Sequence, residues 1–362
     1  MNRIISVVGA RPNFMKVAPI HRAFGSYAES WSHSIVHTGQ HYDAAMSDAF
    51  FSDLDMPHPA YFLGVGSGSH AEQTARVMTG FEQVCKEAQP DYVIVVGDVN
   101  STIACALVSV KLGIRTAHVE AGLRSGDRSM PEEINRLATD AIVDDLFVTE
   151  ESGRLHLLRE GVDPSRIHFV GNTMIDSLHY ALPKTATCTI VQGLGFTSGG
   201  YMLVTMHRPS NVDSPEQLAM LMEVVARVSS DLPVVFPVHP RTRKNIAEFG
   251  ITVPSSVILL DPVGYVEFLA LMKSAAMVLT DSGGIQEETT ALGVPCITSR
   301  TTTERPVTVE CGTNILVEPT SEAIRTAVAR VRRGDGPKGM IPPLWDGKAA
   351  ERIAAIITRH YS

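Results

Sequence analysis

Short apolar runs rich in β-branched residues alternate with helical patterns along the whole chain, and this alternation limits the fold more than any other feature. A strand, a helix and a second strand in succession close most readily into a parallel βαβ unit. We therefore expect mainly parallel sheets with helices on their faces. The expected strands cover residues 4–8, 34–38, 92–96, 114–119, 146–149, 167–170, 201–206, 234–238, 257–260, 277–280, 296–297 and 314–317, and helical patterns cover 70–88 and 101–112.

The two halves of the chain echo each other weakly, which indicates two domains. Each half opens with a strand that ends in Arg-Pro, at Arg11 and at Arg208, and each has a later strand that ends in an aspartate, Asp98 or Asp281. A length of 362 residues also favours two domains. The segment 183–200 lacks periodicity and is rich in Gly, Thr, Ser and Pro, so we expect a linker there. The predicted fold class is α/β, with two doubly wound Rossmann-like domains that face each other across a cleft.

Composition excludes several classes of partner. The formal net charge of −8 argues against nucleic acid or an anionic membrane as the main partner, although a few local cations can still hold a small anion. The five cysteines form no CxxC pair, which favours buried thiols in a reducing cytosol. No apolar run suits a signal peptide or a membrane span, and the thirteen histidines show neither HExxH nor HxH. We expect a cytoplasmic, soluble protein without a bound metal.

Two strand-to-helix turns have the residues of an anion site. The first, at residues 9–16, carries Arg11 and Lys16, and a solvated loop with two surface cations explains it equally well. The second, at residues 281–288, is sharper. Ser282 can cap a helix and bind a phosphate, while Gly283 and Gly284 let a diphosphate approach the backbone. Neither a GxGxxG nor a GxxxxGK[ST] pattern is present, so the dinucleotide-binding and Walker types are excluded.

Other polar residues extend the second turn. Glu288 can accept hydrogen bonds from ribose hydroxyls, although an exposed helical glutamate is the common alternative, and Arg305 adds a cation from a loop. The pair His207-Arg208 ends the first strand of the second half and is predicted to face the same turn, which favours a functional role over a structural one. The basic segment 239–244 is explained as well by a solvated helix start.

Carboxylates gather in and near the stretch 118–136. A short strand closes on Glu120, and Pro131 opens a helix whose apolar residues 134, 137, 138, 141 and 142 predict one buried face. Asp98 follows an earlier strand, and Glu132 lies in the first turn of that helix. Three carboxylates on one edge fit acid/base chemistry on a sugar. The structural alternatives are a helix cap at Asp98 and a capping box that joins Ser129 to Glu132; Asp127 is interpreted as a loop residue.

Seven segments carry a resemblance to a known family. They read Val-Gly-Ala-Arg-Pro at 8–12, His-Thr-Gly-Gln-His at 37–41, Gly-Asp-Val-Asn-Ser-Thr at 97–102, Met-His-Arg at 206–208, Asp-Ser-Gly-Gly-Ile-Gln-Glu-Glu at 281–288 and Thr-Glu-Arg-Pro at 303–306, together with the stretch 118–136. Over nearly its whole length the chain resembles the UDP-N-acetylglucosamine 2-epimerases of the non-hydrolysing type, in an archaeal-like branch. The resemblance implies a GT-B fold, UDP held mostly by the C-terminal domain, and a homodimer. It also implies reversible conversion of UDP-GlcNAc to UDP-ManNAc through elimination of UDP, a 2-acetamidoglucal and re-addition, without NAD or metal.

The resemblance also assigns boundaries and roles. Because the last helix, within 346–360, is implied to pack back on the first domain, the domains are residues 1–183 with 346–362, and residues 184–345. Asp98, Glu120 and Glu132 resemble the acid/base carboxylates, and His207 the residue beside the diphosphate. The residues that resemble the UDP contacts are Arg11, Lys16, Ser282, Gly283, Gly284, Glu288 and Arg305, with Arg208 beside His207 and Phe268 beside the uracil.

Two departures from the family pattern define the alternatives. Where many bacterial members read Gly-Gln-His-Arg-Glu-Met and bind a second, regulatory UDP-GlcNAc, this chain has Gly39-Gln40-His41-Tyr42-Asp43-Ala44, which leaves regulation open. Where many read His-Arg-Arg-Glu-Asn, residues 207–211 read His-Arg-Pro-Ser-Asn. Relatives that epimerise UDP-2,3-diacetamido-2,3-dideoxyglucuronate share some of these features and form the first alternative. A hydrolysing sister enzyme, a glycosyltransferase and a UDP-sugar sensor are the others.

Overall fold

The chain folds into two compact units in a computed structural model that describes residues 1–40, 51 and 53–361. One unit comprises Met1–Tyr180 and Pro343–Ser362, and the other comprises Ala181–Pro342. Compactness alone does not show where an independently folding domain ends, so the predicted division at residues 183/184 and 345/346 stays a prediction.

The first unit is built on a seven-stranded sheet in the order β3-β2-β1-β4-β5-β6-β7, and every described strand pair in it is parallel. The strands are β1 (Asn2–Val8), β2 (Trp31–His37), β3 (Tyr61–Phe62), β4 (Tyr92–Val96), β5 (Arg115–Ala121), β6 (Asp145–Val148) and β7 (Ile167–Phe169). The helices are α1 (Arg11–Gly25), α3 (His70–Ala88), α4 (Asn100–Lys111), α5 (Pro131–Ile142), α6 (Glu151–Arg159), α7 (Thr173–Ala181) and α16 (Ala349–Arg359). The two-residue strand β3 was not predicted, because it is too short to show a period.

The second unit repeats this plan with six parallel strands in the order β10-β9-β8-β11-β12-β13. The strands are β8 (Met202–Thr205), β9 (Val234–Pro237), β10 (Val257–Leu260), β11 (Met277–Thr280), β12 (Cys296–Ser299) and β13 (Asn314–Val317). The helices are α8 (Ile190–Gly193), α9 (Pro209–Val212), α10 (Pro215–Ser229), α11 (Pro240–Glu248), α12 (Tyr265–Ser274), α13 (Gly283–Leu292), α14 (Pro306–Glu310) and α15 (Ser321–Arg332).

Both sheets reverse their winding direction at one point, and this point matters for function. In the first unit the order changes direction between β1 and β4, and in the second unit between β8 and β11. Open α/β sheets bind ligands outside the carboxyl ends of the strands at such a switch point. The turns that follow β1, β4, β8 and β11 hold Arg11, Asp98, His207 and Ser282. The predicted site residues therefore occupy the binding edge of each sheet.

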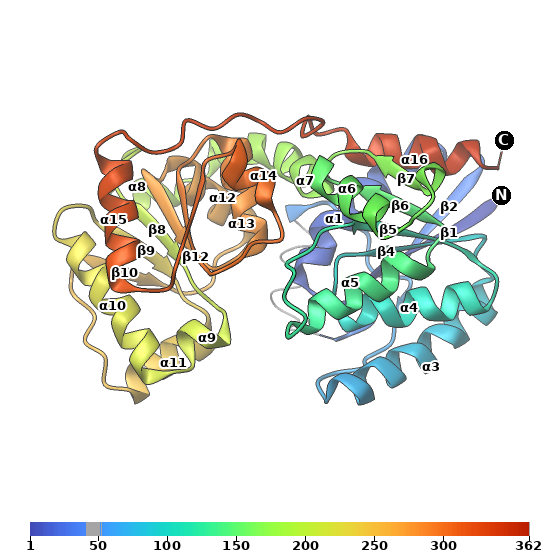
Figure 1. The fold of residues 1–362 in the computed structure, drawn as a ribbon, viewed down its shortest axis with the longest axis horizontal. Coiled ribbons are helices and arrows are strands. Elements are labelled where there is room, and N and C mark those ends of the chain that lie inside the picture. Colours follow the sequence, from blue (N-terminus) through green and yellow to red (C-terminus); the bar gives the residue numbers. More distant parts are fainter. Residues whose placement is uncertain (41–50, 52, 362) are drawn as a thin grey trace. The chain divides into compact units, whose positions relative to one another are not determined.

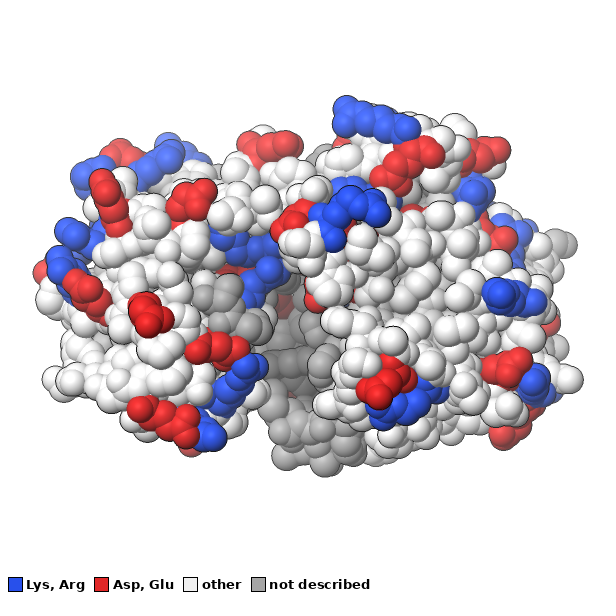
Figure 2. All heavy atoms as spheres, turned by 60° about the horizontal axis from the view of Figure 1, so that its bottom comes forward, with Lys and Arg blue, Asp and Glu red and all other residues white. Residues whose placement is uncertain are grey.

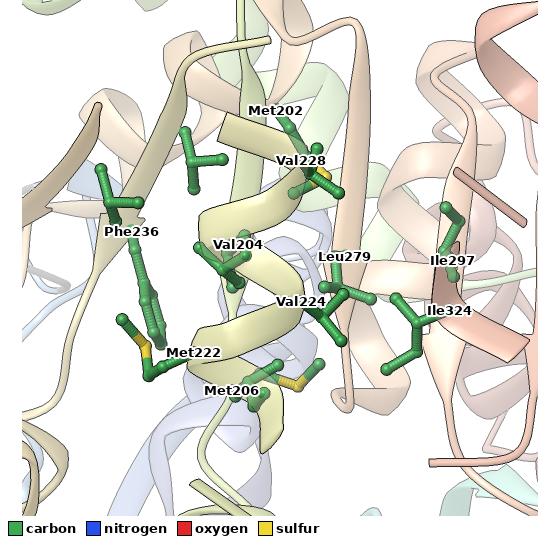
Figure 3. Packing of buried hydrophobic residues seen from close by; sticks show 14 of the residues in the cluster. Met202, Val204, Met206, Met222, Val224, Val228, Phe236, Leu279, Ile297 and Ile324 are labelled. Carbon is green, nitrogen blue, oxygen red and sulfur yellow. The ribbon is translucent and has the colours of Figure 1, made fainter. Parts of the chain in front are cut away.

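The core of the second unit explains why its strands are nearly all apolar. Val224 and Val228 of α10 contact the sheet beside Val204 of β8, and Phe236 of β9 and Leu279 of β11 complete the layer (Figure 3). All of these side chains are at most 7% exposed. Burying each one contributes about 1.5–3 kcal/mol relative to the exposed side chain. A parallel sheet covered on both faces requires such continuous apolar runs.

The chain returns to the first unit at its end. Trp345 is fully buried and its indole Nε1 donates to the Thr149 carbonyl at 3.0 Å. The following helix α16 packs beside α1, with Ile353 and Ile357 buried, and both chain ends lie in this unit (Figure 1). The predicted amphipathic face is therefore present, although Ile356 is only half-buried.

The linker predicted over residues 183–200 is wrong. This segment forms a 3₁₀ helix, η2 (Leu182–Thr187), followed by α8, and both pack against α12. Its Gly, Pro and Ser content misled the prediction, because short helices start and stop at such residues as readily as loops do.

The surface gives no sign of a large single-charge field on the face drawn in Figure 2. Lys and Arg side chains lie next to Asp and Glu side chains over both units on this face (Figure 2). No helix in the described part of the chain is long and apolar enough to span a membrane. Among the described residues, no disulfide joins any of the five cysteines.

Candidate active site

A cluster of four charged side chains lies at the switch point of the first unit. Lys16 of α1 forms an ion pair with Glu120 at the end of β5. Arg136 of α5 forms a second ion pair with Asp98 after β4, and its Nη2 also lies 3.5 Å from Glu120 Oε1. Lys16, Glu120 and Arg136 are each at most 5% exposed, whereas the Asp98 side chain is 28% exposed. The structure thus brings together three predicted residues, and adds Arg136.

The backbone at Glu120 leaves the regular strand conformation. Its φ is 76°, and the register of β5 against β6 shifts between Val119 and Ala121. A non-glycine residue in this left-handed region costs about 1–3 kcal/mol and persists only where the surroundings hold it. The bulge also breaks the alternation of side chains along the strand. The orientation of the Glu120 side chain therefore depends on this local distortion as well as on its position in the sheet.

The buried face of α5 is polar, so the predicted apolar face is wrong. The side chains of Glu133, Arg136 and Asp140 are at most 4% exposed, whereas Ile134 is 41% exposed. The helical period is right but its phase is not. Glu133 accepts hydrogen bonds from the backbone N–H of Ser125 and Gly126, at 2.8 and 3.2 Å, which fixes the loop before the helix. The helix faces the sheet with the residues that organise the strand-end loops.

Glu132 is exposed in the first turn of α5, and the capping box that was the structural alternative to a catalytic role is absent. The N-cap residue is Met130, which has no side-chain cap, and Ser129 Oγ donates instead to Asp127 at 2.6 Å. Glu132 is therefore not occupied as a capping partner. Within the described residues, no hydrogen bond or ion pair joins it to Asp98 or Glu120, so the structure does not place it in their cluster.

In the second unit, Asp281 organises the end of β8 and the end of β11. This carboxylate is fully buried and accepts hydrogen bonds from the backbone N–H of His207 and Arg208 and from the Asn211 amide at 2.9 Å. Its Oδ1 also lies 3.0 Å from His207 Nδ1. Burial alone would raise the pKa of Asp281, but the His207, Asn211 and Arg208 contacts bring it below its usual value. The His207 ring is 57% exposed and is held from behind by a buried carboxylate.

In the turn from β11 into α13, the Arg305 guanidinium lies beside the backbone of Gly283. A Cβ built on Gly283 would lie 2.7 Å from Arg305 Nη1, so a larger residue at this position would displace the guanidinium. Arg305 also pairs with Glu287 at 3.0 Å and with Glu304 at 3.4 Å. Burial raises the pKa of Glu304, but Arg300 and Arg305 outweigh it and lower this pKa to about 2. Ser282 is the N-cap residue by its backbone, but its side chain does not make the predicted cap hydrogen bond.

The remaining predicted contacts of the second unit, Glu288, Phe268 and Arg208, lie on three different segments. Glu288 is 3% exposed and accepts a hydrogen bond from the Tyr265 hydroxyl at 2.8 Å, so the exposed alternative is wrong. Phe268 lies three residues after Tyr265 on α12 and is half-buried. Arg208 donates from Nε to the Asp281 carbonyl at 3.2 Å.

Two sets of predictions lie outside the described residues. Arg11 opens α1 with its backbone, but its side chain is outside them. His41, Tyr42, Asp43 and Ala44, on which the prediction about a regulatory site depended, are outside them as well.

Outside these turns, three side chains bring possible metal-ligand atoms within 4.8 Å of one another, namely Asp145, His168 and His360. Asp145 already accepts hydrogen bonds from Tyr92 at 2.6 Å and from Arg115 at 2.9 Å. A guanidinium and a metal cation compete for the same carboxylate. We therefore interpret this group as a polar contact between the sheet and the end of α16.

Sequence reasoning missed the residues that hold the site from behind. Arg136 and Asp140 share a buried face with Glu133 at helical spacing, and Asp281 was noted only as a strand end. The available signal was the spacing of charged residues at 133, 136 and 140, which repeats with a helical period.

Known proteins are similar in sequence to nearly the whole chain. The family profile described as UDP-N-acetylglucosamine 2-epimerase matches residues 26–358. The chain is 42% identical to the UDP-N-acetylglucosamine 2-epimerase of Methanocaldococcus jannaschii over 97% of this chain and 98% of that one. The chain belongs to the UDP-N-acetylglucosamine 2-epimerase family. The family resemblance stated from the sequence, including the archaeal-like branch, is confirmed.

Solved structures of the family agree. The crystal structure of the M. jannaschii UDP-GlcNAc 2-epimerase in complex with UDP-GlcNAc and UDP superimposes with a TM-score of 0.90 over 99% of both chains, at 41% identity. This confirms the predicted fold class, two Rossmann-like domains of the GT-B type. A further epimerase family relative, the UDP-2,3-diacetamido-2,3-dideoxy-D-glucuronate 2-epimerase of Pseudomonas aeruginosa, is 39% identical over 99% of each chain.

Proposed function

We propose that this chain is an isomerase that interconverts UDP-N-acetylglucosamine and UDP-N-acetylmannosamine by inverting carbon 2 of the sugar. The observation that carries the proposal is the pair of carboxylates, Asp98 and Glu120, held by Lys16 and Arg136 at the switch point of one sheet. The fold is that of a relative whose structure contains UDP-GlcNAc and UDP. A UDP-sugar is therefore the substrate class.

The chemistry follows from an elimination and its reversal. A base removes the proton at carbon 2, and the electrons of that C–H bond form a double bond to carbon 1 as the bond to the UDP oxygen breaks. The product is a 2-acetamidoglucal and UDP. Re-addition of UDP to carbon 1, with protonation of carbon 2 from the other face, gives the epimer. At least two acid/base groups are required, because a base and an acid must act on opposite faces of carbon 2. We assign these roles to Asp98, Glu120 and Glu132.

The second unit supplies what the leaving diphosphate needs. The N-terminus of α13 at Ser282 and Gly283 presents backbone N–H groups, which favour an anion. Arg305 lies beside Gly283, and His207 is held at the end of β8 by Asp281. We assign Arg208, Gly284, Glu288, Phe268 and Arg11 to the same substrate, with Glu288 on the ribose and Phe268 beside the uracil. These groups stabilise the negative charge that develops on the departing UDP.

Two finer statements belong to this proposal. We infer a homodimer, as the family resemblance implies, and a cytoplasmic location, which suits a protein whose cysteines form no CxxC pair. No NAD enters the proposed reaction, because the proton leaves and returns at the same carbon without a change of redox state, and the family resemblance implies that no metal is needed.

The Pseudomonas relative supports one alternative substrate, UDP-2,3-diacetamido-2,3-dideoxy-D-glucuronate, since its identity of 39% is close to the 42% of the M. jannaschii enzyme. Each UDP-sugar is incubated with the protein and the products are separated by anion-exchange chromatography. UDP-ManNAc formed from UDP-GlcNAc supports the proposal. Turnover of the uronate alone selects the alternative, and free UDP with free N-acetylmannosamine selects a hydrolysing enzyme.

Glu132→Gln separates an enzyme from a UDP-sugar sensor. Loss of a general acid or base lowers turnover by about 10²–10⁴-fold. We expect this loss with unchanged UDP binding, measured by calorimetry. The exposed Glu87 in the last turn of α3 provides the control, as Glu87→Gln makes the same chemical change before the amino end of β4 rather than after the carboxyl end of a strand.

A further inference from the structure

We propose that His118 and Asp140 form a buried positioning pair that holds the loops of Asp98 and Glu120 in their reactive arrangement. This inference rests on the proposed function, because it gives the two carboxylates a common support. The pair lies behind the charged cluster and contributes side chains from β5 and α5.

His118 connects two strand ends. It lies on β5 two residues before Glu120 and is fully buried. Its Nδ1 is 2.6 Å from Asp140 Oδ1, and its Nε2 is 2.7 Å from the carbonyl oxygen of Gly97. Gly97 directly precedes Asp98. The ring therefore fixes the peptide that leads into one carboxylate from the strand that carries the other.

Asp140 extends the same support to the far side of Glu120. Its Oδ2 accepts a hydrogen bond from the Gly122 backbone N–H at 3.0 Å and an ion pair from Arg124 Nη1 at 2.7 Å. Gly122 follows Glu120 by two residues. His118 and Gly122 thus bracket Glu120, and Asp140 contacts both of them.

The hydrogen bonds give each polar atom of the pair a partner. A carbonyl oxygen only accepts, so His118 Nε2 donates to Gly97. Asp140 accepts from Gly122 and Arg124, and burial alone would raise its pKa, but His118 and Arg124 lower this pKa below the usual value. An amide at position 140 replaces one of the two acceptor oxygens by a donor, so it cannot reproduce all of these contacts.

A strictly structural role explains this arrangement less well. Neighbouring residues of β5, Ala117 and Val119, are buried and apolar, as a parallel strand covered on both faces requires. A histidine in the same strand, paired with a buried carboxylate of α5, has to overcome desolvation, so packing alone favours an apolar residue there. The strained backbone of Glu120, with φ 76°, persists only while its neighbours hold it. The pair fixes the chain two residues before Glu120, at His118, and two residues after it, at Gly122.

The test compares His118→Gln, His118→Asn and Asp140→Asn with the wild-type enzyme. Gln retains a donor in the direction of Gly97, and Asn retains one in the direction of Asp140, so the two histidine variants separate the two contacts. Small displacements of catalytic groups cost about 100-fold in rate. We expect kcat to fall by about this factor in Asp140→Asn while KM for UDP-GlcNAc changes little. Asp140→Asn with the wild-type kcat overturns the proposal.

A matched control removes a buried carboxylate elsewhere in the same unit. Asp176 is 6% exposed and accepts the N–H groups of Ala349 and Ala350 at 3.1 and 2.7 Å. Asp176→Asn is expected to reduce thermal stability without a loss of kcat below the melting temperature. If it lowers kcat as much as Asp140→Asn does, the effect is general destabilisation and the proposal is wrong.

Amide hydrogen exchange keeps the inference separate from the proposed function. We expect peptides that cover residues 119–124 to exchange faster in Asp140→Asn, because its single amide oxygen cannot accept from both His118 and Gly122, while peptides of the second unit do not change. Equal exchange in both proteins overturns the positioning role even where the substrate is another UDP-sugar. Absence of any UDP-GlcNAc turnover by the wild type refutes the proposed function and leaves the exchange result to decide on the pair. If Asp140→Asn does not fold, the two histidine variants provide the same comparison.

Discussion

Glu120 illustrates how a single residue joins backbone and side-chain chemistry. Its carboxylate contacts Lys16 and Arg136, and its backbone lies in the left-handed region. The local sequence placed a carboxylate at a buried strand end, where an unpaired charge is costly, and so indicated a functional role. It did not show the bulge, because the register between β5 and β6 depends on a strand that lies beyond α5 in the chain. The residue type was therefore predictable and its conformation was not.

Glu120→Gln is predicted to lower kcat by about 10²–10⁴-fold. The substitution keeps the size of the side chain but removes its ability to take or give a proton. UDP binding is expected to remain, since the anion-binding turn belongs to the second unit. Steady-state kinetics on UDP-GlcNAc and calorimetry with UDP measure the two effects. A Glu120→Gln variant that keeps most of the wild-type kcat contradicts this role.

His33 gives the first unit a predictable pH dependence. Its Nε2 lies 2.8 Å from Ser6 Oγ and its Nδ1 lies 2.7 Å from His21 Nδ1. Burial, together with His21, lowers the pKa of His33 from 6.5 to about 3. The unfolded chain therefore takes up a proton that the folded chain does not, and the stability of the neutral ring is complete above pH 6.5 and lost as the pH falls toward 3.

We expect the free energy of unfolding to be about 2 kcal/mol lower at pH 5 than at pH 8 through His33 alone. In His33→Gln the difference between the two pH values should shrink by this amount. Denaturant titrations at both pH values measure it. His37, whose pKa burial lowers to about 4, contributes a further decline that the variant retains. An unchanged pH dependence in His33→Gln would refute the assignment.

Among the elements, the turns at the two switch points, which follow β1, β4, β8 and β11, were the most predictable part of the molecule. Their residues follow strands directly, so a local pattern of strand, small residues and charge locates them. Helix α5 was less predictable. Its apolar residues predicted a buried face, but Glu133, Arg136 and Asp140 occupy it because they bind groups on other elements. Periodicity of apolar residues alone contains no information about such distant partners.

The turn before α13 gives a prediction for an element as a whole. In Gly283→Ala the added Cβ would lie 2.7 Å from Arg305 Nη1, and Arg305 has little freedom to move because Glu287 and Glu304 hold it. We expect weaker UDP binding, by about 10-fold or more, with a small change in the melting temperature. Gly193→Ala in α8 is the control, since a Cβ there meets nothing within 4 Å. Equal UDP affinity in both variants would contradict this role of the turn.

At the scale of the whole molecule, the return of the chain to the first unit links the two ends of the sequence. Helix α16 packs on α1, and Arg352 Nη1 donates to the Val170 carbonyl at 2.9 Å. The amphipathic pattern of the last residues was readable from the sequence, whereas the surface that it covers came from the family resemblance. An isolated pattern shows which face is buried but not against what.

Ile353→Ala tests this connection. Ile353 is fully buried, and replacing a buried isoleucine by alanine costs about 2–5 kcal/mol. We expect a lower melting temperature for the first unit. Ile356 on the same helix is only half-buried, so Ile356→Ala should cost less. Differential scanning calorimetry of both variants measures the contrast, and equal melting temperatures would argue that α16 does not stabilise the first unit.

The central claim is that carbon 2 of the sugar loses its proton and regains one from the other face. Incubation of the protein with UDP-GlcNAc in deuterated water, followed by ¹H NMR and mass spectrometry, measures this step directly. We predict that both UDP-GlcNAc and UDP-ManNAc acquire deuterium at carbon 2 as the mixture approaches equilibrium. UDP-GlcNAc that stays unlabelled after long incubation, or an epimer that forms without deuterium, would contradict the claim.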